Sequence, residues 1–267
     1  MGETFYKELI KDMTWSYSRI TCFEDCPYKW FLKYIKEYDE APLFYSSYGS
    51  FMHELIGKYY SQQITKEEML SEFLFSFKDK VLGERPGGNI TANYIEAGKQ
   101  YIKSIKWLEC APVDVEREYR FDINGSKFIG FIDYLGENHK DLYIVDHKSR
   151  NLSPRTNRKN QTAKDKELDK MLRQLYLYSA AVKQKHGYFP KYLCFNCFKN
   201  GVFIKEQFDE DKYNETIEWA TKTIHEIENT TEFLPNINYF NCRFLCGLKD
   251  ECCYWNGGGY SETRRHK

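Results

Sequence analysis

Acidic and basic side chains meet at the end of one apolar run, LYIVDHKSR, which covers residues 142–150. Its first four residues suit a buried strand, and Asp146, His147 and Lys148 follow directly. Side chains alternate between the two faces of a strand, so Asp146 and Lys148 should point to the same face. A carboxylate beside an ammonium group can bind a cation, orient a water molecule and stabilise developing charge. An isolated pair of this kind is more often a surface ion pair, so the surrounding sequence must decide.

A second carboxylate, Asp133, lies in the preceding β-rich segment, KFIGFIDYL at residues 127–135. We expect the turn between the two segments to set Leu135 opposite Leu142. In that register the two aspartates lie diagonal to each other, roughly 7–8 Å apart between Cα atoms. A slip of one residue would turn Asp133 to the other face. Mg²⁺ takes oxygen ligands and is commonly held by one or two carboxylates and a substrate phosphate. The two segments therefore predict a site for a hard cation.

The order of the expected helices and strands around these aspartates predicts one α/β domain with a mixed sheet. A helix should open near Tyr17, with Ser16 or Ser18 as its cap. The predicted strands and later helices are 113–123, 127–135, 141–148, 191–198 and 202–208, then 164–186 and 211–230. The three predicted parts are a mainly helical N-terminal part, a catalytic sheet with one helix, and a C-terminal helix with a cysteine-rich tail: residues 1–110, 111–210 and 211–267.

Composition excludes some classes of partner. Hydrophobic residues make up 42% of the 267 residues and charged residues 29%, which suits a globular chain with a sizeable core. Lys plus Arg and Asp plus Glu each number 39, so no overall positive field indicates nucleic acid. No run approaches the roughly 18 apolar residues of a membrane span, and the first residues lack the apolar stretch of a signal peptide. We therefore expect no membrane partner and a cytoplasmic location.

A local basic segment follows the aspartates. Residues 148–164 carry six Lys or Arg and no acid. Such a run is usually a solvated loop. Its place directly after Asp146 favours contacts to phosphates, which supply affinity without reading base sequence. The candidate nucleic-acid contacts are Arg150, Arg155, Arg158 and Lys159.

Cysteines gather near the C-terminal end. Cys242, Cys246 and Cys252 have the spacing C-x3-C-x5-C, and Cys26 lies far upstream in the dipeptide CP. Thiols stay reduced in the cytoplasm, so metal binding or burial is expected rather than disulfides. Cys253 adjoins Cys252, which leaves the last ligand open, although the spacing favours Cys252.

Several motifs, in order, resemble the RecB-like branch of the PD-(D/E)XK nuclease superfamily. GFIDYL followed by YIVDHK resembles the superfamily's paired acidic strands and lysine. SYSRITCFEDCPYKWFLKYI is similar to the branch's N-terminal S-x-S and CP helix, YGSFMHEL to its G-x-x-x-H motif, and RQLYLYSAA to its Q-x-x-x-Y motif. The resemblance implies a restriction-endonuclease-like core, a mixed sheet flanked by helices.

The resemblance also implies roles for the matching residues. Lys148 would be the catalytic lysine, and Gln174 and Tyr178 would line the site and touch substrate. An accessory acid would be Glu116 or Glu118, between which the sequence does not choose. One or two Mg²⁺ or Mn²⁺ ions would have as ligands His53, Asp133, Asp146 and the carbonyl oxygen of His147.

The cysteine pattern resembles the iron–sulfur subgroup of these nucleases, which includes the nuclease domain of AddB and nucleases of CRISPR adaptation. The resemblance implies a 4Fe-4S cluster that joins the two ends of the chain, held by Cys26, Cys242, Cys246 and Cys252. This chain has three residues between the first tail pair where the family usually has two. Tetrahedral zinc is the alternative, because four thiolates also suit it.

The implied function is a metal-dependent DNA nuclease, an exonuclease on single-stranded or end-containing DNA, in the cytoplasm of a bacterial or phage-infected cell. A helicase, or proteins of DNA recombination and repair or CRISPR adaptation, would be its partners. One alternative is a non-catalytic nucleic-acid-binding or scaffold module that keeps the fold and cluster. Another is a phosphodiesterase that acts on RNA or a small nucleotide.

Overall fold

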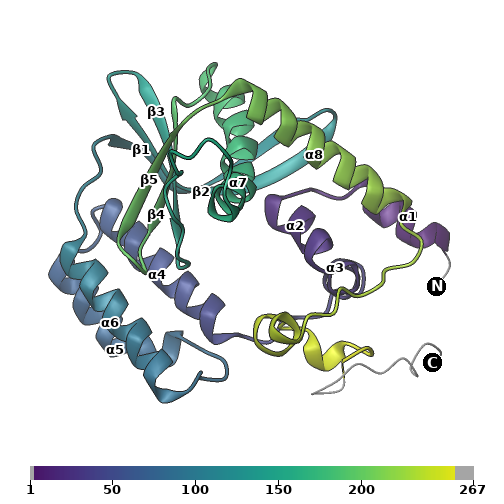
Figure 1. Cartoon of the computed structure of the whole chain (residues 1–267), viewed down its shortest axis with the longest axis horizontal. Helices are drawn as coiled ribbons and strands as arrows, with labels where there is room; N and C mark the ends of the chain where they lie inside the picture. The colour runs from purple at the N-terminus through teal and green to yellow at the C-terminus, as the bar shows by residue number, and fades with distance from the viewer. Residues whose placement is uncertain (1–2, 256–267) are drawn as a thin grey trace.

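A five-stranded sheet forms the centre of the chain in the computed structural model, which describes residues 3–255 (Figure 1). The last twelve residues of the predicted C-terminal part, 256–267, lie outside the described residues. The strands lie side by side in sequence order, and only β3 and β4 are parallel to each other. The predicted mixed sheet is therefore confirmed. The strands are β1 (Ala111–Ile123), β2 (Ser126–Asn138), β3 (Asp141–Lys148), β4 (Tyr192–Cys197) and β5 (Val202–Gln207).

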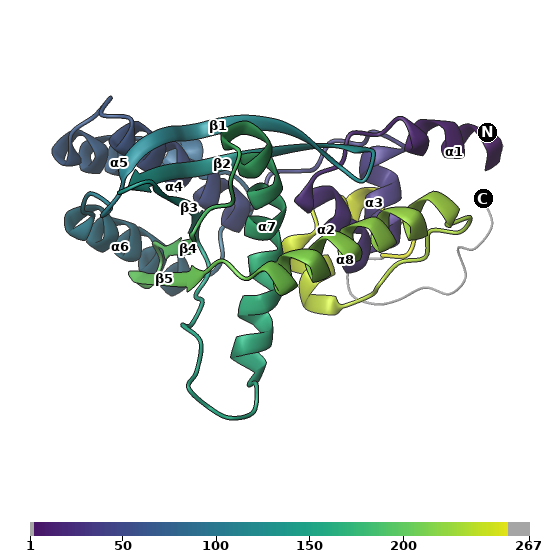
Figure 2. The ribbon, with the colours of Figure 1, turned by 90° about the horizontal axis from the view of Figure 1, so that it is seen from above.

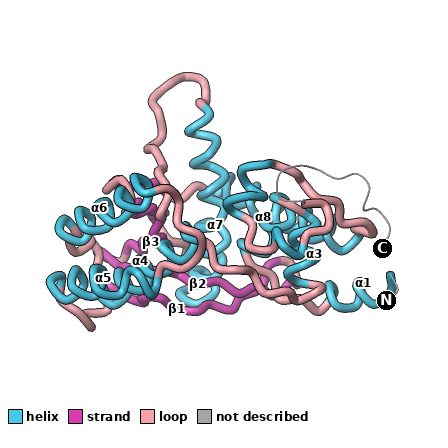
Figure 3. Tube along the Cα trace, turned by 90° about the horizontal axis from the view of Figure 1, so that it is seen from below, coloured by secondary structure: helices cyan, strands magenta, loops and turns pink. Residues whose placement is uncertain are grey.

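Helices cover both faces of the sheet and bury one apolar core on each side (Figures 2 and 3). One core lies beneath α4, α5 and α6, and the other joins the sheet to α7, α8 and the first three helices. The helices are α1 (Glu3–Lys11), α2 (Tyr17–Asp25), α3 (Pro27–Tyr34), α4 (Phe44–Tyr60), α5 (Lys66–Lys80), α6 (Gly88–Ser104), α7 (Ala163–His186) and α8 (Glu210–Asn229). Within residues 3–255, no helix has both the length and the apolar character needed to cross a membrane.

The hairpin of β2 and β3 differs from the predicted register. Leu135 pairs with Ile144 and not with Leu142, so the prediction is wrong by two residues. The strands run further than expected and leave a turn of only His139 and Lys140, whose φ angles of 50° and 71° are typical of a type I′ turn. A shift of two residues keeps every side chain on its face. It also sets Asp133 directly opposite Asp146, where the pairing of the two strands ends.

The N-terminal helical segment breaks where the sequence suggested one continuous run. Ser16 caps α2, as expected, by accepting a hydrogen bond from the backbone N–H of Arg19. Cys26 has an extended backbone, closes α2, and caps α3 through its sulfur. Pro27 occupies the first position of α3, where its missing N–H costs nothing. The break therefore fixes Cys26 at a junction between two helices.

The longest helix, α7, begins well outside the body of the molecule, and Figure 2 shows its first turns projecting together with the loop that precedes them. Thr162 and Asp165 form a capping box at its first turn. Asp165 also accepts hydrogen bonds from the backbone and hydroxyl of Thr156, each at 2.7 Å. These bonds tie the loop to the helix, and we refer to residues 149–170 as the prong.

Candidate active site

The central acidic and basic groups lie at the end of β3. Lys148 Nζ lies 2.7 Å from Asp146 Oδ2, so the two side chains share a face, as the alternation predicted. Asp146 is 2% exposed, and that oxygen has no well-aligned hydrogen bond. The backbone N–H of His147 donates to Asp133 Oδ2 at 2.7 Å. The middle of β2 and the end of β3 thus bring two buried carboxylates and one lysine together.

Helix α7 holds the lysine from one side. Gln174 Oε1 accepts a hydrogen bond from Lys148 Nζ at 2.8 Å, and Gln174 Nε2 donates to the Tyr178 hydroxyl at 3.0 Å. The four-residue spacing places Gln174 and Tyr178 on one helix face. Gly130 of β2 leaves room for the tyrosine ring, because a Cβ there would lie 2.5 Å from it. The two residues of the Q-x-x-x-Y motif therefore form a chain of hydrogen bonds that ends on the lysine.

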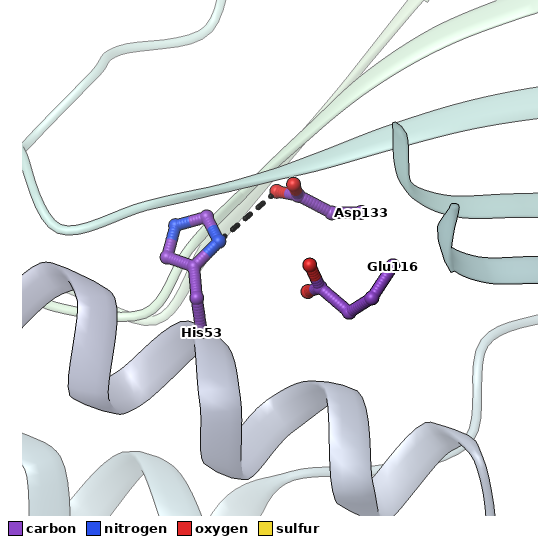
Figure 4. Close-up of side chains that lie close together, drawn as sticks. All are labelled: His53, Glu116 and Asp133. Atoms are coloured by element: carbon purple, nitrogen blue, oxygen red, sulfur yellow. Dashed lines mark ion pairs between the residues drawn. The ribbon is translucent and has the colours of Figure 1, made fainter. Parts of the chain in front are cut away.

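Helix α4 contributes from the opposite side. His53 Nδ1 lies 3.3 Å from Asp133 Oδ2, and the histidine side chain is 29% exposed. Figure 4 shows the imidazole, Asp133 and Glu116 turned toward one another from a helix and two strands. One ligand atom from each lies within 4.8 Å of the other two. These three residues could share a cation with little rearrangement.

Of the two glutamates that the sequence could not separate, Glu116 and not Glu118 lies beside His53 and Asp133. Glu118 instead forms a surface ion pair with Arg120 at 2.8 Å. Glu116 has a φ of 49°, a left-handed conformation that is rare within a strand. Its side chain passes over Gly57 of α4, where a Cβ would lie 2.7 Å from Glu116 Cγ. Gly57, two residues after His53–Leu55, is the sequence signal for this close approach.

Burial and neighbouring charges set the ionisation of these groups. Burial disfavours the ionised form of Asp133. The hydrogen bond and charge of His53 outweigh this effect, so the pKa of Asp133 is lowered. Burial and the charge of Asp133 raise the pKa of Asp146 against the opposing charge of Lys148. Burial, with repulsion from Asp133, raises the pKa of Glu116 to about 7. Neighbouring carboxylates that repel one another favour a divalent cation, so the donors fit Mg²⁺ or Mn²⁺.

The side chain of His147 points away from the lysine into the core on the α4 side. Its Nδ1 lies 3.1 Å from Asn196 Nδ2, and its ring stacks on Tyr60 at 5.7 Å between centroids. Burial lowers the pKa of His147 to about 3, which keeps the imidazole neutral. These contacts fix the backbone of His147, whose N–H meets Asp133.

The predicted phosphate contacts divide into paired and exposed residues. Arg155 pairs with Asp169 at 2.7 Å and with Glu206 at 2.8 Å, which ties the loop to α7 and β5. Arg150 pairs with Glu167. Arg158 and Lys159 are exposed near the tip of the prong.

The four predicted cluster cysteines line one cavity between α3 and the C-terminal tail. Burial, with the neighbouring cysteines adding, raises the pKa of the Cys252 thiol to about 11. Cys253 is not among the lining residues, and its sulfur lies 3.2 Å from the Tyr28 hydroxyl. The structure thus brings Cys252, and not Cys253, to the cavity. The cysteines that line it are Cys26, Cys242, Cys246 and Cys252.

Four cysteine thiols that line one cavity are donors that suit an iron–sulfur cluster. The same four donors also suit tetrahedral zinc.

Comparisons with known proteins agree with this geometry. The family model of the PD-(D/E)XK nuclease superfamily matches residues 14–253. The crystal structure of a "Putative exonuclease" from Eubacterium rectale has the same fold, with a TM-score of 0.54 and 11% sequence identity over 91% of each chain. No curated protein sequence matches the chain significantly. A family match over most of the chain, with the acidic pair and lysine on neighbouring strands, means that this chain belongs to the PD-(D/E)XK nuclease superfamily.

Proposed function

We propose that the chain is a Mg²⁺- or Mn²⁺-dependent DNA nuclease of the RecB-like branch, an exonuclease that hydrolyses single-stranded or end-containing DNA. The observation that carries the proposal is the contact of Lys148 with buried Asp146, one strand away from Asp133 with its histidine partner. A surface ion pair would not need a 2% exposed carboxylate or a hydrogen-bonded chain behind the lysine. The whole chain would act as one nuclease domain.

In this proposal the bound ion would be held by His53, Asp133, Asp146 and the His147 carbonyl, with Glu116 as a further ligand. A metal ion of this kind lowers the pKa of a bound water and stabilises charge on a phosphate. Lys148 would orient the attacking water and stabilise the negative charge that develops on the phosphate. Gln174 and Tyr178 fix the position of the ammonium group through their hydrogen bonds.

The cysteine cavity would hold a 4Fe-4S cluster with a structural role. Its four ligands would join α3 to the C-terminal tail, so that metal binding contributes to folding free energy. Anaerobically purified protein should be brown and contain about four irons per chain. Colourless protein with one zinc per chain would contradict the cluster and leave the nuclease proposal standing.

Exposed cations on the prong would contact the phosphates of the DNA. Arg158 and Lys159 are placed for this role, while Arg150 and Arg155 would contribute only by exchanging their ion pairs for phosphate contacts. A separate helicase, or a protein of recombination or CRISPR adaptation, would present the DNA end.

The proposed function is tested by digestion of end-labelled single-stranded DNA, duplex DNA and RNA with Mg²⁺ or Mn²⁺. We expect metal-dependent shortening of DNA from an end, which also reports cleavage polarity. Preferred hydrolysis of RNA or of a small nucleotide would favour a phosphodiesterase of another class. DNA binding without any hydrolysis would favour the scaffold alternative. Asp141→Asn is the control for a substitution of Asp146, since Asp141 also lies on β3 but pairs with Lys191 at the surface.

A further inference from the structure

A groove of about 250 Å³ opens at the N-terminal end of α4. Three segments far apart in the sequence form it: the first turn of α4, the loop between α5 and α6, and the π-helical turn Asn241–Leu245 of the tail. Figure 1 shows this part of the tail beside the start of α4. Residues that line the groove include Tyr45, Arg85, Ile90, Phe240, Arg243 and Phe244.

Close backbone contacts hold the three segments together. Gly83, with a φ of 92°, approaches so near that a Cβ would lie 2.6 Å from the Phe44 nitrogen. Gly247 packs in the same way, and a Cβ there would lie 2.7 Å from the carbonyl oxygen of Ala41. The Ala41 N–H also donates to the Gly247 carbonyl at 2.9 Å. The groove is therefore fixed by the packing of the backbone.

Aromatic faces and cations alternate along the groove. Phe240 is 55% exposed and Phe244 is 43% exposed, and their ring centroids lie 5.4 Å apart. The guanidinium carbon of Arg243 lies 5.9 Å from the Phe244 centroid. The lining also includes Arg85 and Lys249, and its single carboxylate, that of Glu84, lies 3.9 Å from Arg243 Nη2. Exposed rings that bases can stack on, flanked by cations for the backbone, are typical of sites for single-stranded nucleic acid.

One face of α4 leads from this groove to the active site. Tyr45, Gly49 and His53 are spaced by four residues and so lie on one face of the helix. Eight residues of helix span about 12 Å, or three to four stacked nucleotides at about 3.4 Å each. Midway, Gly49 lies against Ser149, the neighbour of Lys148, since a Cβ would be 3.4 Å from its Oγ.

We propose that this groove, which we call the strand groove, binds the unpaired strand of a DNA substrate a few nucleotides from the bond that is cut. Its bases stack on Phe240 and Phe244, and its phosphates pair with Arg85 and Arg243. The link to cleavage rests on the proposed nuclease function, whereas the binding itself does not. A substrate too short to reach the groove gains nothing from it.

The test is fluorescence-anisotropy binding of labelled dT15 and dT3 by the full-length protein without divalent metal. We expect Phe240→Ala with Phe244→Ala to weaken dT15 binding tenfold or more, because each lost base stack costs about 1–3 kcal/mol. Binding of dT3 should weaken as well, because three nucleotides are enough to stack on both rings. Phe75→Ala is the matched control, since Phe75 is 87% exposed on α5, outside the groove. It should leave both affinities unchanged.

Two further variants test the same groove, and one of them lies outside the tail in case the double variant disturbs the cysteine cavity. Arg85→Ala lies in the loop between α5 and α6 and should reduce the salt dependence of dT15 binding by about one phosphate contact. Phe244→Trp should retain binding, because a larger ring still stacks. Iron content and circular dichroism report whether each variant is folded.

Unchanged dT15 affinity in the folded double variant and in Arg85→Ala would overturn the proposal. An equal loss in Phe75→Ala would overturn it too, because the loss would then not depend on the groove. If the variants instead abolish self-association measured by light scattering and bind DNA normally, the groove is a protein interface. Failure of the proposed function is separate: it appears as no hydrolysis by the wild-type protein, whatever the anisotropy shows.

Discussion

The sequence predicts the placement of some residues at the site and not of others. Strand alternation correctly placed Asp146 and Lys148 on one face, because it depends only on local backbone geometry. Glu116 could not be chosen over Glu118 by the same rule, since its left-handed φ of 49° departs from the regular strand. The choice depends on the contact with Gly57 of α4, which no local pattern contains.

Replacement of Lys148 should separate catalysis from metal binding. In Lys148→Met the carboxylates remain, so the Mn²⁺-induced rise in melting temperature should persist. The hydrolysis rate should fall about 10²–10³-fold, the usual effect of losing one group that stabilises transition-state charge. Both quantities are measured on the same preparation by thermal shift and by release of labelled nucleotide. Loss of the thermal shift would place the lysine among the groups that bind the metal.

Replacement of Glu116 should change stability in a pH-dependent way. Its pKa is raised to about 7 in the fold, so the unfolded carboxyl loses its proton first and wild-type stability falls as pH rises from about 4 toward 7. Glu116→Gln removes that loss. Without metal the variant should be more stable than the wild type at pH 8, by about 1 kcal/mol after allowing for solvent screening of this partly exposed side chain.

The difference should vanish below about pH 4, where Glu116 is protonated in both the folded and the unfolded state. Mn²⁺ should stabilise the wild type more than the variant at pH 8. Urea unfolding of each protein at both pH values, with and without Mn²⁺, measures its free energy of unfolding under all four conditions. A variant less stable than the wild type at pH 8 without metal would show that the charge of Glu116 is satisfied in the fold.

At the scale of elements, the order and type of the central strands and of α7 and α8 followed from the sequence, because their periodicities and turn residues are local. The register of β2 with β3 did not, since the two-residue turn uses His139 and Lys140 in a conformation more typical of Asn and Gly. The break at Cys26 was also missed, although Pro27 marks it.

The close approach of α4 to β1 gives a prediction at this scale. Gly57→Ala places a methyl group against Glu116 Cγ, which can move because it belongs to a flexible side chain. Helix propensity favours alanine, so the melting temperature should stay the same or rise. Mn²⁺ affinity should fall several-fold, because Glu116 is displaced. Gly88→Ala in α6 is the control, where a Cβ meets nothing within 4 Å. Unchanged Mn²⁺ affinity in Gly57→Ala, measured by calorimetry, would remove Glu116 from the site.

At the scale of the whole molecule, the cysteine cavity joins segments that are more than two hundred residues apart in sequence. The motif order predicted which cysteines meet, and the structure brings those four to one cavity. Sequence spacing could not decide between Cys252 and Cys253, because adjacent residues differ only in the direction of their side chains. In the structure Cys252 lines the cavity and Cys253 does not.

Loss of one cavity cysteine should therefore affect the whole fold. Cys252→Ser should lower the iron content and the melting temperature, because the group that ties α3 to the tail is lost. Cys253→Ser should retain iron and differ little in stability. Iron analysis and thermal unfolding of both variants provide the comparison. Equal iron in both would mean that Cys252 is not a ligand.

The most direct measurement of the central claim compares wild-type protein and Asp146→Ala in hydrolysis of end-labelled single-stranded DNA with Mn²⁺. The buried aspartate is the proposed metal ligand beside the lysine, so the wild type should shorten the DNA and the variant should lose activity by at least about 10³-fold while remaining folded. Equal hydrolysis by both proteins would contradict the assignment of this site.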